Sequence, residues 1–214
     1  MNFDYGKLRL AAVRDMAATL GDVGDADWEE PSLCEGWQIR HIPSHLVTGY
    51  LFQPEQVAEV VAQVGSVPEA ARLGAIEFAS THDSPAIVEA FERHAGQPEP
   101  TGIAAVIPPT DLFVDQVVHR FDVAIPLGLP VYVSEEQLAA ALSVMPSIEG
   151  FIRSSERARG LRLEATDVGW MWGDGPVVRG PAEAILLALS DGPAAEGEGV
   201  ELLSARQGVD GRLQ

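Results

Sequence analysis

Residues 34–45 read Cys34-Glu35-Gly36-Trp37-Gln38-Ile39-Arg40-His41-Ile42-Pro43-Ser44-His45, and a second stretch reads Asp115-Gln116-Val117-Val118-His119. Asp115 and His119 are four residues apart, a spacing that turns both side chains to one face of a helix, about 40° apart around its axis. Two imidazoles and one carboxylate can hold a zinc-like ion and leave one coordination position open for chemistry. His45, Asp115 and His119 are therefore a candidate set of metal ligands, split between two parts of the chain.

Spacing alone leaves other interpretations of these residues open. His41 precedes His45 by four residues, so these two histidines could themselves form the pair, with Asp115 elsewhere. An Asp and a His four residues apart are also common as a surface pair or a satisfied polar contact. The neighbours of Asp115 and His119 are strongly apolar, however, and an unpaired polar group on a buried face costs on the order of a few kcal/mol. A metal ion would satisfy both side chains.

The composition excludes several classes of partner. The chain has 214 residues, of which 46% are hydrophobic, enough for the core of one large domain or two small ones. Its 32 acidic and 14 basic residues give a formal net charge of −18, which disfavours nucleic acids and anionic membranes. We find no signal region and no apolar run near the ~20 residues of a membrane span. Cys34 is the only cysteine, so no intrachain disulfide can form and the cytoplasm is the expected compartment.

Hydrophobic periodicity predicts a chain that is nearly all helix up to about residue 150. The expected helices cover residues 3–20, 38–51, 57–64, 67–80, 84–94, 110 to about 126, and 134–144, with Pro43 near the start of the second, where proline is tolerated. After Gly160 the pattern predicts strands over 161–166, 169–172 and 176–178, a helix over 182–189 and a further strand over 200–203. The fold class is therefore mainly α, with a helical bundle over residues 1–150 and a small α+β domain over residues 151–214.

The stretch from Pro31 to Leu46 resembles the N-terminal signature of the mycothiol-dependent maleylpyruvate isomerase family, within the DinB/YfiT-like group of thiol-dependent metalloenzymes. In that family a C-x-G-W segment leads into a helix whose histidine binds metal, and the equivalent position here is His45 rather than His41. A second signature, an acidic residue followed by His and then Asp, corresponds to Asp115, His119 and Asp122. The segment Pro126-Leu127-Gly128-Leu129-Pro130 follows as in many relatives, and residues 161–189 resemble the family's small C-terminal domain.

The resemblance implies a DinB-like four-helix bundle with one divalent metal, usually zinc, held by His45, Asp115 and His119. Asp115 replaces the glutamate of the founding isomerase, and a shorter carboxylate is still a legitimate zinc ligand. Asp122, one helical turn beyond His119, is a candidate for orienting an imidazole, or else a carboxylate at the helix end or surface. Trp37 and Arg120 are candidates for substrate binding. We expect Cys34 to be a packing residue, and no catalytic acid, base or nucleophile is singled out.

The function implied is that of a cytoplasmic, metal-dependent isomerase or S-transferase that activates mycothiol, a low-molecular-weight thiol, for reaction with a small-molecule substrate. Two alternatives are a metal-dependent hydrolase or lyase that does not use mycothiol, and a non-catalytic binding protein that keeps the fold. The expected assembly is a monomer or a homodimer. One departure weakens maleylpyruvate as the substrate: the founding isomerase has a Gly-Arg pair after its C-terminal helix, and Asp191-Gly192 stands there in this chain.

Overall fold

The structure is a computed structural model, and it describes residues 2–148 and 154–190. Its contacts divide the chain into two units, Met1–Val131 and Tyr132–Gln214. The expected strand over residues 200–203 and the pair Asp191-Gly192 lie outside the described residues. No helix in the described ranges is both long and apolar enough to cross a membrane.

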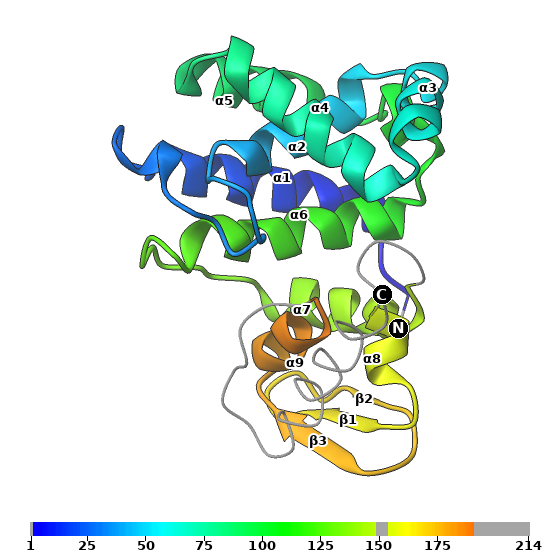
Figure 1. The fold of residues 1–214 in the computed structure, drawn as a ribbon. Coiled ribbons are helices and arrows are strands. Elements are labelled where there is room, and N and C mark those ends of the chain that lie inside the picture. The colour runs from blue at the N-terminus through cyan, green and yellow to red at the C-terminus, as the bar shows by residue number, and fades with distance from the viewer. Residues whose placement is uncertain (1, 149–153, 191–214) are drawn as a thin grey trace. The chain divides into compact units, whose positions relative to one another are not determined.

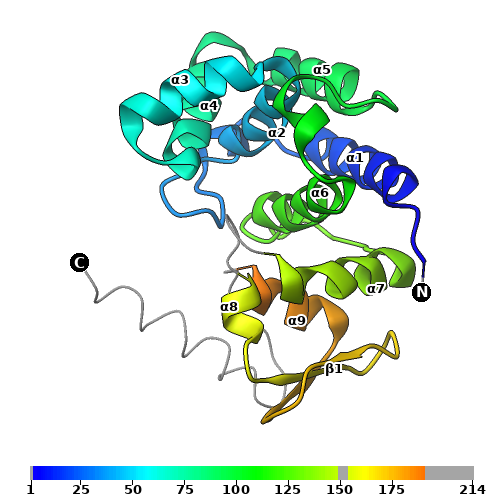
Figure 2. The same cartoon turned by 90° about the vertical axis from the view of Figure 1, so that its right-hand side faces the viewer.

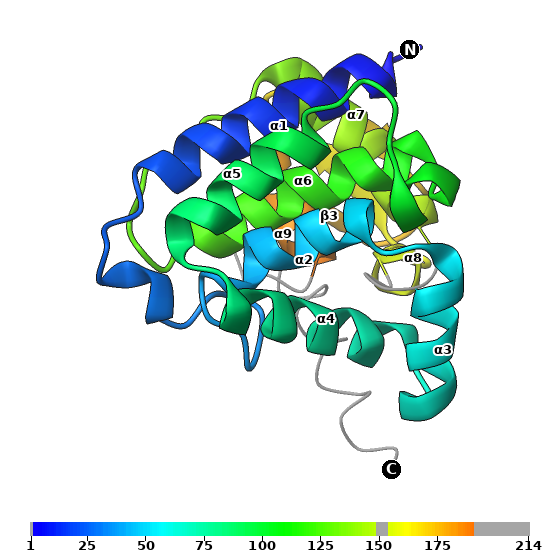
Figure 3. The ribbon, with the colours of Figure 1, turned by 90° about the horizontal axis from the view of Figure 1, so that it is seen from above.

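The first unit is built around a four-helix bundle. Its helices are α1 (Tyr5–Gly21), α2 (His41–Leu51), α5 (Ser84–Ala95) and α6 (Pro109–Ala124). Helix α1 packs against α5 and α6, and α2 packs against the same two helices, so the four form a closed ring around a shared core (Figures 1 and 3). The mainly α fold with a four-helix bundle, expected from the sequence, is confirmed.

The core of this bundle follows from apolar residues that recur three or four positions apart on each helix. Burying a side chain of this size stabilises the fold by about 1.5–3 kcal/mol, so the periodic face of each helix is what holds the ring together. The buried residues that the four helices contribute to this cluster are Val13, Met16, Leu20, Ile42, Leu46, Val47, Tyr50, Phe91, Ala95, Leu112 and Val123.

Helix α2 begins at His41, three residues later than the sequence pattern predicts. The preceding residues take part in loop pairing instead of helix. Pro31 and Gln38 form an isolated antiparallel bridge, and the backbone N–H of Ile39 donates to the carbonyl of Glu30 at 2.9 Å. Backbone groups already paired across the loop cannot also join a helix, which delays the start of α2. Pro43 therefore lies in the first turn of the helix, where a backbone N–H would have no acceptor within the helix, so its absence in proline costs no hydrogen bond.

Two further helices cover one side of the bundle. Helix α4 (Val67–Thr81) packs on α2, and α3 (Pro54–Val64) packs on α4 (Figure 2). The helix expected over residues 57–64 begins earlier, at Pro54, because Gln53 and Gln56 form a capping box and proline suits the first turn. Two short 3-10 segments, η1 (Asp27–Glu29) and η2 (Gly102–Val106), complete this unit.

The second unit combines helices with a three-stranded sheet. In chain order it contains α7 (Glu135–Val144), η3 (Met145–Ser147), α8 (Ser154–Ala158), β1 (Arg162–Ala165), β2 (Met171–Trp172), β3 (Val177–Gly180) and α9 (Ala182–Leu189). The strand order is β2-β1-β3, with β2 antiparallel and β3 parallel to β1. The strands expected over 169–172 and 176–178 are both present, but β1 lies between them. Helix α9 lies between the sheet and α7 (Figure 2).

The contacts of α7 explain where the chain divides. Helix α7 has the capping box of Ser134 and Gln137 that the sequence predicts, and it packs against α9 of the same unit. The division by contacts therefore falls between Val131 and Tyr132, ahead of α7. The domain boundary expected near residues 150–160, where the helical pattern is followed by a strand pattern, lies within the second unit.

Candidate metal centre

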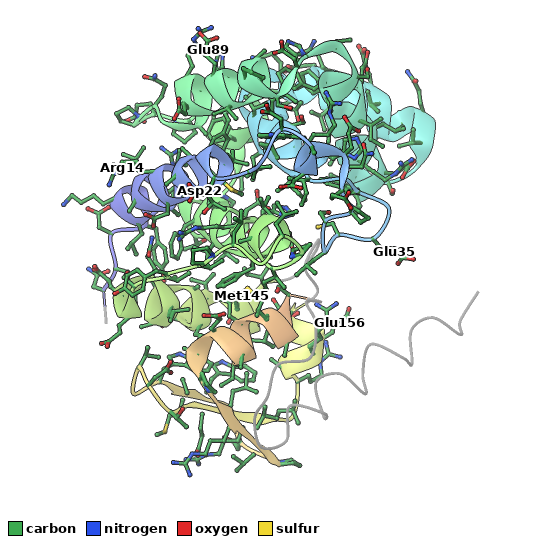
Figure 4. The ribbon with its side chains drawn as sticks, turned by 90° about the vertical axis from the view of Figure 1, so that its left-hand side faces the viewer. Arg14, Asp22, Glu35, Glu89, Met145 and Glu156 are labelled. Carbon is green, nitrogen blue, oxygen red and sulfur yellow. The ribbon has the colours of Figure 1, made fainter. Side chains whose placement is uncertain are left out.

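A tight turn before α2 contributes two side chains to the candidate site. In Cys34-Glu35-Gly36-Trp37 the backbone N–H of Trp37 donates to the Cys34 carbonyl at 3.0 Å. Gly36 has a φ of +76°, which the third position of a type II turn requires and which other residues adopt only with strain. Glu35 is at the outer end of the turn, with its side chain directed away from the helices (Figure 4). The first and last residues of the turn, Cys34 and Trp37, contact the site.

His45, Asp115 and His119 converge between α2 and α6. Asp115 Oδ1 lies 3.9 Å from His45 Nε2 and 3.4 Å from His119 Nε2, and the ring centroids of the two histidines are 5.0 Å apart. One potential ligand atom from each of the three residues lies within 4.8 Å of the other two. The packing of α2 beside α6 thus brings together the three residues expected from the sequence.

His41 is engaged elsewhere. Its Nδ1 accepts the backbone N–H of Gln38 at 3.1 Å, so the ring is bonded to the loop that precedes α2. Burial is the main factor that lowers the pKa of His41, and the nearby guanidinium of Arg40 lowers it further. Neither potential metal-binding group within the described residues contains His41. The alternative pair of His41 with His45 is therefore not assembled around Asp115.

His119 belongs to two triplets of possible ligands: the first is His45, Asp115 and His119, and the second is Cys34, His119 and Asp122. The Nδ1 atom of His119 lies 2.7 Å from Asp122 Oδ2, a short hydrogen bond that the ring donates to the carboxylate. The Cys34 thiol donates to the same oxygen at 3.3 Å, and its sulfur lies 3.9 Å from His119 Nδ1. The Asp122 side chain is 10% exposed, compared with 35% for Asp115. His119 thus has a closed side facing Asp122 and a more open side facing Asp115.

The two carboxylates set the charge of His119 when no metal is bound. Burial alone would lower the pKa of His119, but Asp115, followed by Asp122, raises it well above the ordinary value. Burial would likewise raise the pKa of Asp115, but His119 and His45 together hold it well below the usual range. The metal-free site therefore holds an imidazolium next to a carboxylate. For Cys34, burial raises the pKa and His119 opposes the change, so the thiol keeps its proton at neutral pH.

Trp37 forms an aromatic wall beside the histidines. Its ring is nearly parallel to that of His119, with 14° between the planes and 6.4 Å between the centroids. It meets the ring of His45 edge-on at 5.3 Å. A large apolar surface in this position limits the access of water to both imidazoles.

Arg120 is directed toward α1. Its Nε donates to Thr19 Oγ1 at 2.8 Å, and its Nη1 lies 4.0 Å from Asp15 Oδ2. The residue follows His119 in sequence, but the helical rotation of about 100° per residue carries its side chain to a different face of α6. A role for Arg120 in substrate binding would have to replace these contacts.

The donor set of the first triplet suits a divalent transition metal. Two imidazole nitrogens and one carboxylate oxygen are the ligand types that zinc uses in catalytic sites. Two ligands of a tetrahedral ion at ~2.0–2.2 Å are themselves separated by about 3.3–3.6 Å. Asp115 Oδ1 and His119 Nε2, 3.4 Å apart, have this separation, whereas His45 Nε2, at 3.9 Å from the same oxygen, would have to move closer by a few tenths of an ångström. The 2.7 Å contact between His119 and Asp122 is shorter than such a separation and has the length of a hydrogen bond. The residues present therefore fit an ion in the first triplet and a shared proton in the second.

Comparison with known proteins gives the following relatives. Residues 9–99 match the family model described as the mycothiol maleylpyruvate isomerase N-terminal domain. The match contains the stretch from Cys34 to His45 and ends before α6. No curated protein sequence matches the chain.

Two solved structures share the fold. A histidine-to-alanine mutant of the mycothiol-dependent maleylpyruvate isomerase is 20% identical, with a TM-score of 0.58, and the alignment covers 88% of this chain and 90% of that one. A second structure of the mycothiol-dependent maleylpyruvate isomerase is 17% identical, with a TM-score of 0.53, covering 91% and 90%. The alignments extend over both units, so the likeness in fold is not confined to the four-helix bundle.

Proposed function

We propose that this chain is a metal-dependent enzyme that activates mycothiol for isomerisation or S-transfer. Its residues 9–99 match the model of the mycothiol maleylpyruvate isomerase N-terminal domain, which supports this proposal. The observation that carries this proposal is the convergence of His45, Asp115 and His119, two of which lie outside the matched segment. The match and the geometry are thus separate lines of support for one site.

His45 Nε2, Asp115 Oδ1 and His119 Nε2 would hold the metal, for which zinc is the best fit to the donor set. When bound, a zinc ion with three protein ligands lowers the pKa of a thiol at its remaining position and so supplies a thiolate at neutral pH. A thiolate can add reversibly to a conjugated substrate, which permits isomerisation, or displace a leaving group.

The residues around the ligands have supporting roles. Asp122 accepts the Nδ1–H of His119, which fixes the tautomer that leaves Nε2 free to face Asp115. Trp37 covers one side of both imidazoles and offers an apolar face to a bound substrate. Asp115, the most exposed of the three ligands, marks the side from which a thiol can approach.

The charge of the substrate is a further part of this proposal. Maleylpyruvate carries two carboxylates, and an Arg contact is the usual way to bind such an anion. This chain has Asp191-Gly192 at the point where the founding isomerase has its Gly-Arg pair, and Arg120 donates to Thr19. We therefore propose an electrophile with less negative charge than maleylpyruvate.

Metal content provides the first test. The purified protein should hold about one equivalent of zinc, and Asp115→Asn should remove most of it because a neutral amide replaces the anionic ligand. The matched control is Asp111→Asn, one turn earlier on the same helix, where the carboxylate accepts a hydrogen bond from Thr110. Loss of zinc in the control variant, or full retention in Asp115→Asn, would contradict the assigned ligands.

Thiol transfer provides the second test. The zinc-loaded protein is incubated with mycothiol and a bimane electrophile, and the conjugate is measured by fluorescence against the Asp115→Asn variant. Conjugation that depends on Asp115 supports thiol activation. If the metal is present and no conjugate forms above background, a hydrolase or lyase that does not use mycothiol becomes the better description. If the protein also binds no metal, the non-catalytic alternative replaces both.

A further inference from the structure

We propose that Cys34 is a positioning residue for His119, acting through Asp122, an inference that rests on the metal centre proposed above. The thiol lies on the closed side of His119, opposite the ligand face, with its sulfur 3.3 Å from Asp122 Oδ2 and 3.9 Å from His119 Nδ1. Its position depends on the turn Cys34-Glu35-Gly36-Trp37 and on Leu33 before it, and two of the hydrogen bonds that join this segment to α6 end at one residue.

Both contacts are with Asp122. The backbone N–H of Leu33 donates to the Asp122 carbonyl at 3.2 Å, and the Cys34 thiol donates to the Asp122 carboxylate at 3.3 Å. One contact fixes the turn against the helix backbone, and the other reaches the side chain that holds His119. The turn is thus attached to α6 at the residue that orients the imidazole.

The Oδ2 atom of Asp122 accepts from two donors on two different elements. His119 Nδ1 lies 2.7 Å from it on the same helix, and Cys34 Sγ approaches from the turn. Rotation about the last torsion of an aspartate side chain is broad, so one hydrogen bond restricts the carboxylate only weakly. A second donor from a separate direction narrows the range of orientations, and it also satisfies a carboxylate that is 10% exposed.

The consequence concerns the direction of His119 Nε2. When the carboxylate is fixed, the imidazole that donates to it is fixed as well, and Nε2 remains 3.4 Å from Asp115 Oδ1. Supporting partners of metal-binding histidines commonly contribute about 10–100-fold to affinity. Cys34 acts on the ring through one more hydrogen bond than Asp122 does, and a thiol is a weak donor. Its effect on zinc affinity should therefore be smaller than that of Asp122.

Packing is the competing explanation, because Cys34 also lies against the apolar core of the bundle. Two substitutions separate the explanations. Cys34→Ser keeps a donor in a similar volume, whereas Cys34→Val keeps an apolar side chain and removes the donor. Zinc affinity is measured by competition with a chelating dye. We expect Cys34→Ser to stay within about twofold of the unaltered chain and Cys34→Val to bind about 3–10-fold more weakly, below the range of a direct partner.

Wild-type affinity in Cys34→Val, or an equal loss in both variants, would overturn the proposal and leave packing as the role of Cys34. If valine prevents folding, Cys34→Ala replaces it, since alanine also lacks the donor and cannot clash.

A readout on the metal-free protein separates this inference from the proposed function. In ¹⁵N-histidine NMR, the Nδ1–H of His119, identified by its loss in His119→Ala, should be protected from exchange. It should remain protected in Cys34→Ser and exchange faster in Cys34→Val. Equal protection in all three proteins would contradict the role of Cys34 whether or not zinc binds. A protein that fails to bind zinc but shows the expected exchange pattern would refute the metal centre and not the hydrogen-bonded array.

Discussion

The two sides of His119 differ in spacing and in exposure. Toward Asp115 the gap from Nε2 to the carboxylate is 3.4 Å and the carboxylate side chain is 35% exposed; toward Asp122 the gap from Nδ1 is 2.7 Å and the exposure is 10%. The wider, more accessible side has room for an ion between the partners, whereas the narrower side has room only for a proton. The same types of residue therefore form a candidate coordination site on one side of the ring and a hydrogen-bonded support on the other.

Removing His119 disrupts both sides at once and should have the largest effect. We expect His119→Ala to lower zinc affinity by more than about 100-fold, beyond the range for loss of a supporting partner, because one of three ligands disappears. The measurement is zinc competition with a chelating dye. The matched control is His94→Ala on α5, which belongs to neither triplet. A variant that still binds zinc as tightly as the unaltered chain would remove His119 from the site.

Removing His45 affects only the open side. His45→Ala should weaken zinc binding by roughly 100-fold, while the hydrogen bond between His119 and Asp122 remains, as seen in the histidine NMR spectrum. His41→Ala is the control, since it removes a histidine four residues away whose Nδ1 accepts the N–H of Gln38. Its zinc affinity should be unchanged. Loss of zinc in His41→Ala without loss in His45→Ala would reverse the assignment.

A pH series tests the charge of the open side. Asp115 and Asp122 raise the pKa of His119 well above its ordinary value, so the metal-free ring is a doubly protonated, positively charged imidazolium at neutral pH. Zinc binds the neutral ring, and the proton must therefore leave as the metal enters. The apparent zinc affinity should rise by at least about tenfold for each pH unit between pH 6 and 7, because at least one proton competes with the metal. Isothermal titration in two buffers of different ionisation enthalpy measures the proton released. No proton release would contradict a charged His119.

Straining the turn should have the smallest effect. Gly36 has a φ of +76° and no atom within 4 Å of an added Cβ, so Gly36→Ala meets backbone strain and no clash. The expected loss is about 1–2 kcal/mol in the free energy of unfolding, together with a few-fold loss in zinc affinity as Cys34 and Trp37 shift. Chemical denaturation gives the first quantity. Gly21→Ala, at the end of α1, is the control, with an ordinary φ and equally open space. Equal stability losses in both variants would argue against a strained turn.

Local sequence predicted much of the helical part. The periodic apolar positions of α1, α4 and α5, the capping box of α7 and the bounds of α9 all depend on interactions within about four residues along the chain, which a sequence displays directly. The pattern predicts the start of α2 three residues too early, because apolar spacing gives no sign of the backbone pairing between Pro31 and Gln38. The sheet order does not follow from the local pattern, because β3 pairs with β1 and not with β2, the strand next to it in sequence.

For the site, the ligand types and their spacing on α6 were visible in the sequence, since Asp115 and His119 are related by a single helical turn. The packing role expected of Cys34 agrees with its place against the core, but its hydrogen bond to Asp122 could not be predicted, because Asp122 lies 88 residues away in the chain and a cysteine in a turn gives no local sign of a hydrogen bond. The preference for His45 over His41 came from resemblance, and spacing alone did not supply it.

The helices, their apolar faces and the presence of two histidines and a carboxylate follow from residue chemistry and short-range periodicity, which can be read along the chain. Which atoms come into contact depends on the packing of the helices. Packing α2 beside α6 brought His45 Nε2 to 3.9 Å from Asp115, turned His41 to the start of its helix, and set the Cys34 turn against Asp122. These outcomes depend on how side-chain faces pack in three dimensions, since a contact between distant segments forms only when the whole bundle closes around its core.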